Sequence, residues 1–253
     1  MHGSFIQATT AMFRAPHDPH GNRLARARRV LVGVLVALTC AAPLAGLATP
    51  DLVDRNFRVF IDDKEVGTHR FTFEGRPDAF TVTSKADFAY KLAFVTLFRY
   101  RHEARERWEG GCMVRLDAET TENGDAVTVA GRAMATGFSL SRPDDGATYD
   151  LDCAWGFAYW DPQLRERQTL INPDDGALFD VTWEALGDTP LSFEGRSLRT
   201  RAWALRSDGT GDGEGIDITL YYDRDDRWIA LDAQVGSRTL RYRTAQQDPF
   251  AAR

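Results

Sequence analysis

Apolar and polar residues alternate along most of this chain with a period of two. Between Phe80 and Phe88 every second position carries an apolar or small residue, and the positions between them carry Thr, Lys or Asp. Such alternation places one face of a strand in a core and the other in solvent. The same period recurs in residues 55–61, 65–74, 94–108, 179–185, 216–222, 228–235 and 238–244. It predicts an all-β, mostly antiparallel fold.

Turn-forming residues fall between these alternating segments. Asn123-Gly124 separates residues 112–121 from 125–134, and both central positions of a type I′ hairpin turn need a positive φ. Asp62-Asp63-Lys64 and Gly236-Ser237 separate two further pairs. Consecutive hairpins of this kind predict one curved antiparallel sheet, or a partly closed barrel.

One segment breaks the alternation. Asp161 followed by Pro162 has the character of a helix N-cap followed by proline in the first helical position. We therefore expect a short helix near residues 161–168, packed near the mouth of the sheet. The acidic, glycine-rich stretch Ser207–Gly215 lacks the glutamate that a calcium-binding loop begun at Asp208 would need, and it is interpreted as a solvated loop.

The N-terminal segment is typical of a secretory leader. Arginines 23, 26, 28 and 29 precede an apolar run from Val30, which ends in Gly46-Leu47-Ala48. We expect residues 1–48 to be a cleaved leader and signal peptide, 49–245 a single periplasmic β-rich domain, and 246–253 a flexible tail. The alternative is a retained membrane anchor, although the run is near the lower length limit for a bilayer span and Pro43 interrupts its end.

Charge and cysteine content narrow the function classes. The leader holds five of the 31 basic and one of the 37 acidic residues, so the remainder has a net charge of −10 with histidine neutral. This acidity argues against nucleic-acid binding, which depends on basic side chains that neutralise phosphates. Cys112 and Cys153 remain after cleavage, and an even pair in an oxidising compartment predicts a disulfide. No cofactor or metal site is predicted.

Histidine is scarce after the leader, where only His69 and His102 occur. In residues 94–108 one alternating face carries His102 and Glu106 among aromatic residues, while the other is rich in arginine. Buried imidazoles and carboxylates are costly unless paired. These two groups are therefore either a satisfied polar pair that holds the sheet in register or the polar anchors of a pocket. On a strand they would lie about 13 Å apart, and on a helix about 6 Å apart.

Aromatic residues on the predicted inner faces are the candidate ligand contacts. They are Tyr90, Phe98, Tyr100, Trp108, Tyr159 and Trp160. The segment Cys153–Pro162 holds more aromatic residues than one strand face needs. It is either an aromatic plug between sheet and helix or a wall that faces a ligand.

The sequence also resembles a known family. The likeness covers residues 55–244 and lies in combined motifs: Tyr100-Arg101-His102 with Glu106 and Trp108, Tyr159–Pro162, Leu170–Pro173, Tyr221–Asp223, Trp228–Leu231 and Leu240–Tyr242. These motifs resemble an uncharacterised family of exported Gram-negative bacterial proteins, described as a domain of unknown function. The resemblance implies a mostly β envelope protein, and it brings no reaction, cofactor or catalytic residue.

Three functional hypotheses follow. The leading one is a non-enzymatic envelope module that binds an apolar or amphipathic small molecule, such as a lipid, in the concavity of the sheet. The second is an envelope enzyme that uses His102 and Glu106, with His69 or Tyr100 nearby. The third is a structural or partner-binding envelope protein with a filled core. The sequence does not define the ligand or the oligomeric state.

Overall fold

The computed structural model of the chain describes residues 50–92, 95–141, 146–149, 151–208 and 215–245. It contains fifteen strands and one 3₁₀-helix in the described part. They are, in chain order, β1 (Arg55–Ile61), β2 (Lys64–Arg76), β3 (Ala79–Leu92), β4 (Val95–Glu109), β5 (Cys112–Glu122), β6 (Asp125–Met134), β7 (Gly137–Ser141), β8 (Gly146–Tyr149), η1 (Pro162–Glu166), β9 (Thr169–Ile171), β10 (Leu178–Asp180), β11 (Thr182–Phe193), β12 (Arg196–Ser207), β13 (Ile216–Tyr222), β14 (Trp228–Val235) and β15 (Arg238–Thr244).

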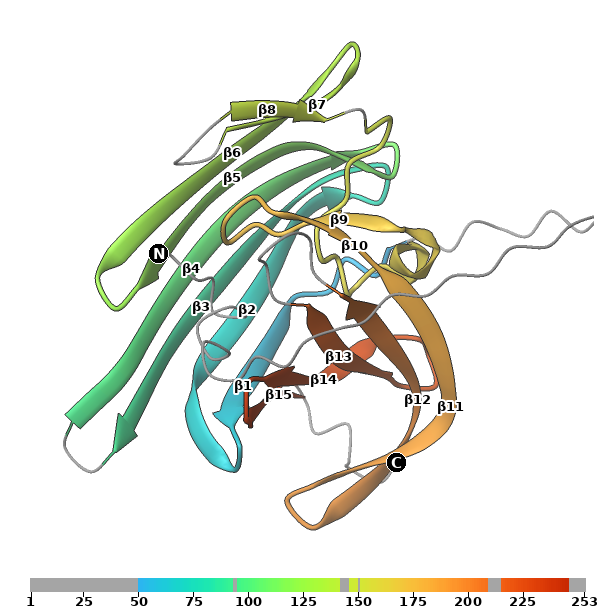
Figure 1. The fold of residues 1–253 in the computed structure, drawn as a ribbon. Coiled ribbons are helices and arrows are strands. Elements are labelled where there is room, and N and C mark those ends of the chain that lie inside the picture. Colours follow the sequence, from blue (N-terminus) through green and yellow to red (C-terminus); the bar gives the residue numbers. More distant parts are fainter. Residues whose placement is uncertain (1–49, 93–94, 142–145, 150, 209–214, 246–253) are drawn as a thin grey trace, which may run out of the picture.

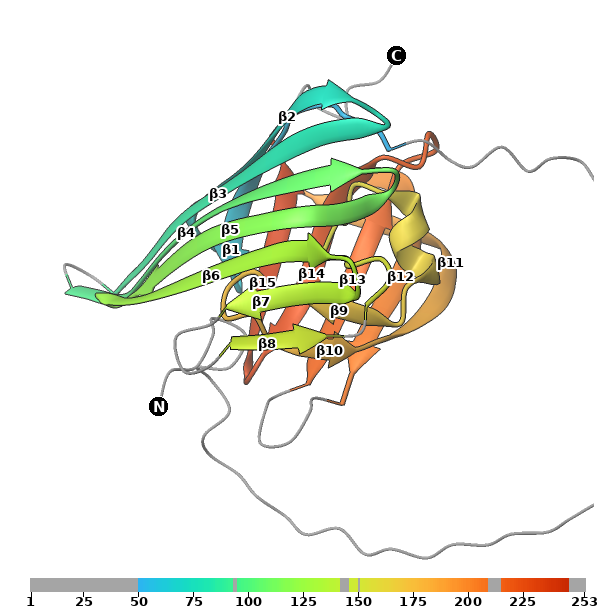
Figure 2. The same cartoon turned by 90° about the horizontal axis from the view of Figure 1, so that it is seen from above.

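Thirteen of these strands form one antiparallel sheet that is curved but not closed. Its order is β11-β12-β13-β14-β15-β1-β2-β3-β4-β5-β6-β7-β8, so that β1 joins the C-terminal strands to the N-terminal ones. Figure 1 shows the long strands β2–β6 curving around one side and β11–β14 around the other, and Figure 2 shows the same two limbs from above. The predicted all-β fold with a curved sheet and a short helix is confirmed.

The predicted turns are present. Asn123 and Gly124 both have positive φ values, of 51° and 105°, as a type I′ turn requires. Gly236-Ser237 joins β14 to β15. The expectation of one strand over residues 179–185 is wrong, because Phe179 belongs to the small sheet of β9 and β10 while β11 begins at Thr182 in the large sheet. Between them, the N–H of buried Val181 donates to the carbonyl of Gln168 over 2.7 Å.

Residues 151–181 form a plug that lies inside the concavity, between the two limbs of the sheet (Figures 1 and 2). The plug contains η1 and the small β9–β10 sheet, and several of its apolar side chains are completely buried: Trp155, Ala158, Leu164, Leu170 and Ile171. Asp161 caps η1 by accepting a hydrogen bond from the N–H of Gln163 over 2.9 Å, and Pro162 follows as predicted. The cap and the proline fix where the plug turns.

The plug is held to the sheet by a covalent bond and by hydrogen bonds. Cys153 forms the predicted disulfide with Cys112 at the start of β5. Directly beside it, the N–H of Met113 donates to the carbonyl of Ala154 over 2.9 Å. On the opposite limb, the hydroxyl of Tyr222 donates to the carbonyl of Tyr159 over 3.1 Å. The plug therefore bridges both limbs.

The outer face of the sheet is also covered near β14. The tip of the β11–β12 hairpin packs its Leu191 against Ile229 and Ala230. At the same tip, Glu194 forms an ion pair of 2.7 Å with Arg58 on β1. These contacts explain why β14 is buried on both faces, and they fix the strand that forms one wall of the site described below.

The expected leader and the expected tail lie outside the described residues, as does most of the Ser207–Gly215 loop. Within the described ranges, no helix has the length and apolar character needed to cross a bilayer.

We predict that the disulfide makes a large contribution to stability. It closes a separation of 41 residues, for which loss of loop-closure entropy corresponds to about 4 kcal/mol. Replacing both Cys112 and Cys153 by serine should lower the free energy of unfolding in urea by about that amount. An unchanged urea midpoint would show that the plug docks equally well without the covalent link.

Candidate functional site

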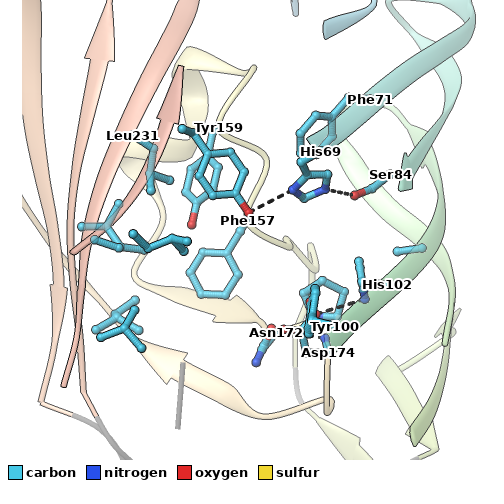
Figure 3. A pocket seen from close by; sticks show the side chains of 18 of the residues that line it. His69, Phe71, Ser84, Tyr100, His102, Phe157, Tyr159, Asn172, Asp174 and Leu231 are labelled. Atoms are coloured by element: carbon cyan, nitrogen blue, oxygen red, sulfur yellow. Dashed lines mark hydrogen bonds and ion pairs between the residues drawn. The ribbon is translucent and has the colours of Figure 1, made fainter. Parts of the chain in front are cut away.

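A cavity of about 130 Å³ remains between the plug and the two limbs of the sheet. One wall comes from β2, β3 and β4, the opposite wall from β13, β14 and β15, and the plug supplies the rest. Figure 3 shows Leu231 on β14 across from His69, Ser84 and His102. A cavity of about 150 Å³ with apolar walls can hold one benzene ring. The space therefore suits one ring, or a short segment of an alkyl chain.

Aromatic side chains make up much of the lining. They are Phe71, Phe88, Tyr100, Phe157, Tyr159, Trp160, Trp228 and Tyr242. Many of them contact one another across elements. The ring centroids of Tyr159 and Trp228 lie 5.1 Å apart, and those of Phe71 and Trp160 lie 5.5 Å apart. Such contacts between aromatic rings stabilise the packing of the walls and make them apolar.

His69 on β2 is held by two hydroxyl groups, one from β3 and one from β15. Its Nε2 lies 2.6 Å from the Oγ of Ser84 (Figure 3). Its Nδ1 lies 3.2 Å from the Oη of Tyr242. Burial lowers the pKa of His69 well below its usual range, and the charge of His102 lowers it further. The ring is therefore a neutral hydrogen-bonding group at neutral pH.

His102 is held by groups from the sheet and from the plug. Its Nδ1 lies 2.9 Å from the Oγ1 of Thr120 on β5 and 3.0 Å from the Oδ1 of Asp174. The hydroxyl of Tyr100 donates to the same oxygen of Asp174 over 2.9 Å. Burial, followed by the nearby charge of Asp174, raises the pKa of Tyr100 well above its usual range. Tyr100 therefore remains a hydroxyl donor.

Glu106 is the buried carboxyl group of the site. It is 5% exposed, and its Oε2 accepts a hydrogen bond from the Nε1 of Trp108 over 2.9 Å. Burial raises its pKa to about 7, although the hydrogen bond from Trp108 opposes the shift. Gly156 of the plug lies close by, since a Cβ built on it would be 3.4 Å from the Oε1 of Glu106. A methyl group at residue 156 would thus be in ordinary van der Waals contact with this carboxyl group.

The structure brings several of the predicted site residues together. Residues 95–109 form a strand, so His102 and Glu106 both point inward as predicted, each with its own partners. Among the aromatic candidates, Tyr100, Tyr159 and Trp160 line the cavity with His69. The segment Cys153–Pro162 is both plug and wall, because Trp155 packs against Trp108 while Tyr159 and Trp160 face the cavity.

Three aromatic candidates do not line the cavity. Trp108 is buried in the core beside Trp155, with ring centroids 4.9 Å apart. Tyr90 and Phe98 face each other near the far end of the β3–β4 hairpin, where the hydroxyl of Tyr90 accepts a hydrogen bond from Arg238 over 3.2 Å. Alternation identifies the inner face correctly, but it does not show how far along that face the plug reaches.

The lining residues that sequence reasoning missed include Ser84, Asp174, Trp228 and Tyr242. Ser84 lay on the predicted inner face of its strand, and its position opposite Phe71 on β2 could have indicated it. Asp174 has no local indication, because its role depends on how the β9–β10 loop docks. In the described ranges no three His, Cys, Asp or Glu side chains are grouped to hold a metal ion.

Comparison with solved structures defines the class of the fold. The chain is similar to a "Beta-barrel-like Protein of Domain of Unknown Function DUF1849 from Brucella abortus", with a TM-score of 0.56 and 10% identity, over 78% of this chain and 98% of that one. At this identity the likeness concerns the fold alone. None of the curated proteins matches the sequence. Residues 57–245 match the family described as domain of unknown function (DUF6134), and the chain belongs to that family.

We predict that Glu106 makes folding stability decrease as the pH rises. Its pKa is about 7 in the folded chain against 4.5 in the unfolded chain, so between these values only the folded state holds this proton. Raising the pH through this window should therefore cost about 3 kcal/mol of stability.

Glu106→Gln keeps an acceptor for the indole N–H of Trp108 but cannot titrate. Urea unfolding at pH 4.5 and pH 8 should show the free energy of unfolding of the wild type falling by about 3 kcal/mol more than that of the variant. Parallel pH profiles for the two proteins would contradict the burial of an isolated carboxyl group.

Proposed function

We propose that this chain is an exported, non-enzymatic envelope module that binds an apolar or amphipathic small molecule between its plug and its sheet. The observation that carries the proposal is the aromatic cavity of about 130 Å³, lined from three separate parts of the fold. Ligand sites are usually preformed apolar cavities with a few polar groups that fix orientation. This cavity likewise has mostly apolar walls, with a few polar groups such as His69, Ser84 and His102.

An enzyme is less well supported by the arrangement of the polar groups. His102 contacts Thr120 and Asp174, whereas Glu106 contacts Trp108, so the two candidate catalytic residues share no partner in the described part of the chain. Each of these contacts is of the kind that satisfies a buried polar group.

The contact between His69 and Ser84 resembles a base beside a nucleophile. Ser84, however, lies in the middle of β3 and pairs in register with Phe71 on one side and Ala104 on the other. Backbone amides in such a ladder are committed to neighbouring strands, and acyl transfer needs free amides to stabilise an oxyanion. We therefore interpret this pair as a fixed polar part of a binding wall.

A purely structural protein with a filled core would instead present an exposed apolar patch for a partner. The large apolar residues exposed in the described part of the chain are Val53, Leu97, Met134 and Leu186. They lie before β1 and on β4, β6 and β11, so no two share an element. Single exposed apolar residues of this kind are ordinary.

Export is part of the proposal. The basic and apolar pattern of residues 23–48 supports a secretory leader. A disulfide between Cys112 and Cys153 fits an oxidising compartment such as the periplasm of a Gram-negative bacterium.

Filling the cavity should abolish binding. Ala233 on β14 lines the cavity and is 8% exposed, so Ala233→Trp places an indole in the space that a ring would occupy. Calorimetric titration of the wild type with the uncharged probe 2-phenylethanol should show saturable binding of one molecule per chain. The variant should lose at least about tenfold in affinity, which corresponds to about 1.4 kcal/mol.

Thr128→Trp is the matched control, because Thr128 is exposed on β6 and the new indole does not reach the cavity. It should bind as the wild type does. If Ala233→Trp does not fold, Ala104→Val narrows the opposite wall by a smaller change. Absence of binding to the wild type, or equal binding to a folded cavity-filled variant, would contradict the proposed function.

A further inference from the structure

The hydroxyl group of Tyr159 differs from the other hydroxyl groups of the cavity. Those of Ser84 and Tyr242 contact His69, and that of Tyr100 donates to Asp174. Tyr159 also lines the cavity, but its hydrogen bonds within the described chain involve its backbone alone. Its hydroxyl is therefore the one in the described lining that the protein does not already use.

This hydroxyl is not sealed inside the packed core. The buried side-chain nitrogen and oxygen atoms that lack a partner in the described ranges belong to Trp160, Arg167 and Arg243. The oxygen of Tyr159 is not among them, so it keeps accessible surface. The residue is half-buried, and Figure 3 shows it between Leu231 on β14 and His69 on β2. Because the ring lies between these two walls, its exposed part faces the cavity.

The groups that act electrostatically on Tyr159 belong to the same site. Burial, followed by the charges of Tyr242, Tyr222 and Asp174, raises the pKa of Tyr159 well above its usual range. Tyr242 and Asp174 both line the cavity. The hydroxyl therefore keeps its proton at neutral pH. Because conjugation with the ring makes a phenol oxygen a weak acceptor, its role toward a ligand is that of a donor.

The position of Tyr159 is fixed by contacts on several sides. Its carbonyl accepts a hydrogen bond from the hydroxyl of Tyr222 over 3.1 Å, and its N–H donates to the carbonyl of Phe157 over 2.9 Å. The centroid of its ring lies 5.1 Å from that of Trp228 and 5.9 Å from that of Phe157. A donor that is held in place in this way loses little conformational entropy when a ligand binds.

The charges around the cavity favour an uncharged acceptor on the ligand. The described lining contains no lysine or arginine, so a carboxylate or phosphate would be buried without a cation, which is strongly unfavourable. His69 does not compensate, because burial lowers its pKa and keeps the ring neutral at pH 7. His102 lies 3.0 Å from the carboxylate of Asp174, which would balance any positive charge on the imidazole.

We propose that Tyr159 determines the specificity of the cavity by donating a hydrogen bond to an uncharged oxygen acceptor, such as a ketone or ether oxygen, on the ligand. The single ring or short alkyl segment of that ligand fills the apolar part of the space. The inference rests on the proposed function, since it concerns the chemistry of a ligand in the same cavity.

The test uses three probes of similar size: acetophenone, ethylbenzene, in which a methylene replaces the carbonyl, and benzoate, which carries an anionic acceptor. Each is titrated calorimetrically into the purified wild type and into Tyr159→Phe at neutral pH. The substitution removes only the hydroxyl, so it should weaken binding of acetophenone about fivefold, the value of one neutral hydrogen bond, and leave ethylbenzene unaffected. Benzoate should bind the wild type at least about tenfold more weakly than acetophenone.

Tyr221→Phe is the matched control. It removes a hydroxyl that donates to Asp232 over 3.2 Å, and Tyr221 packs with Ile229 and Leu191 rather than lining the cavity. It should bind all three probes as the wild type does. If Tyr159→Phe does not fold, the infrared carbonyl stretch of acetophenone bound to the wild type gives a second measurement. A stretch at lower wavenumber than in hexane is expected, and an unshifted stretch would overturn the inference.

The outcomes distinguish this inference from the proposed function. If folded Tyr159→Phe binds acetophenone as tightly as the wild type, or loses acetophenone and ethylbenzene equally, the inference is wrong while the proposed binding function stands. Benzoate that binds as tightly as acetophenone would likewise overturn the assignment of an uncharged acceptor. If neither these three probes nor 2-phenylethanol binds the wild type, both the proposed function and the inference are wrong.

Discussion

The structure depends on the docking of the plug against the inner face of an open sheet. A curved sheet with two free edges cannot bury its own concave face, and that face here carries Phe88, Tyr100 and Trp108. Residues 151–181 cover it and are fixed by the Cys112–Cys153 disulfide and by packing of Trp155 on Trp108. The cavity is the part of the concavity that the plug does not fill. Its existence and its shape therefore follow from where the plug is anchored.

The polar groups of the interior obey one constraint, which is that a buried charge or hydrogen-bonding atom needs a partner. His69 meets it through Ser84 and Tyr242, and His102 through Thr120 and Asp174. The first set of contacts joins β2, β3 and β15, and the second joins β4, β5 and the plug. Glu106 accepts one hydrogen bond, from Trp108, and its burial raises its pKa to about 7.

Much of the fold could be predicted from the sequence because strand alternation and turn chemistry are local. The Asn123-Gly124 hairpin, the capped helix at Asp161 and the inward direction of His102 and Glu106 all follow from neighbouring residues. The break at Val181 could not be predicted by alternation, because the apolar period continues through it while the chain passes from the small sheet to the large one.

The site was harder to predict than the fold. The aromatic segment Cys153–Pro162 indicated either a plug or a wall, and only docking shows that it is both. Asp174 enters the site through a loop between β9 and β10, and its contacts with Tyr100 and His102 join residues more than 70 positions apart. Tyr90 and Phe98 share the pattern of the inner face but do not line the cavity. Strand alternation predicts which face of the sheet a residue lies on, whereas its role in the site depends on how the plug docks.

The central claim is that an accessible apolar cavity lies between the plug and the two limbs of the sheet. A crystal structure of the protein under xenon pressure tests it most directly, because xenon enters apolar cavities of this size without needing a specific contact. The account predicts a xenon site between Phe88 on β3, Tyr159 of the plug and Leu231 on β14. Well-packed side chains in that space, with no xenon bound, would contradict it.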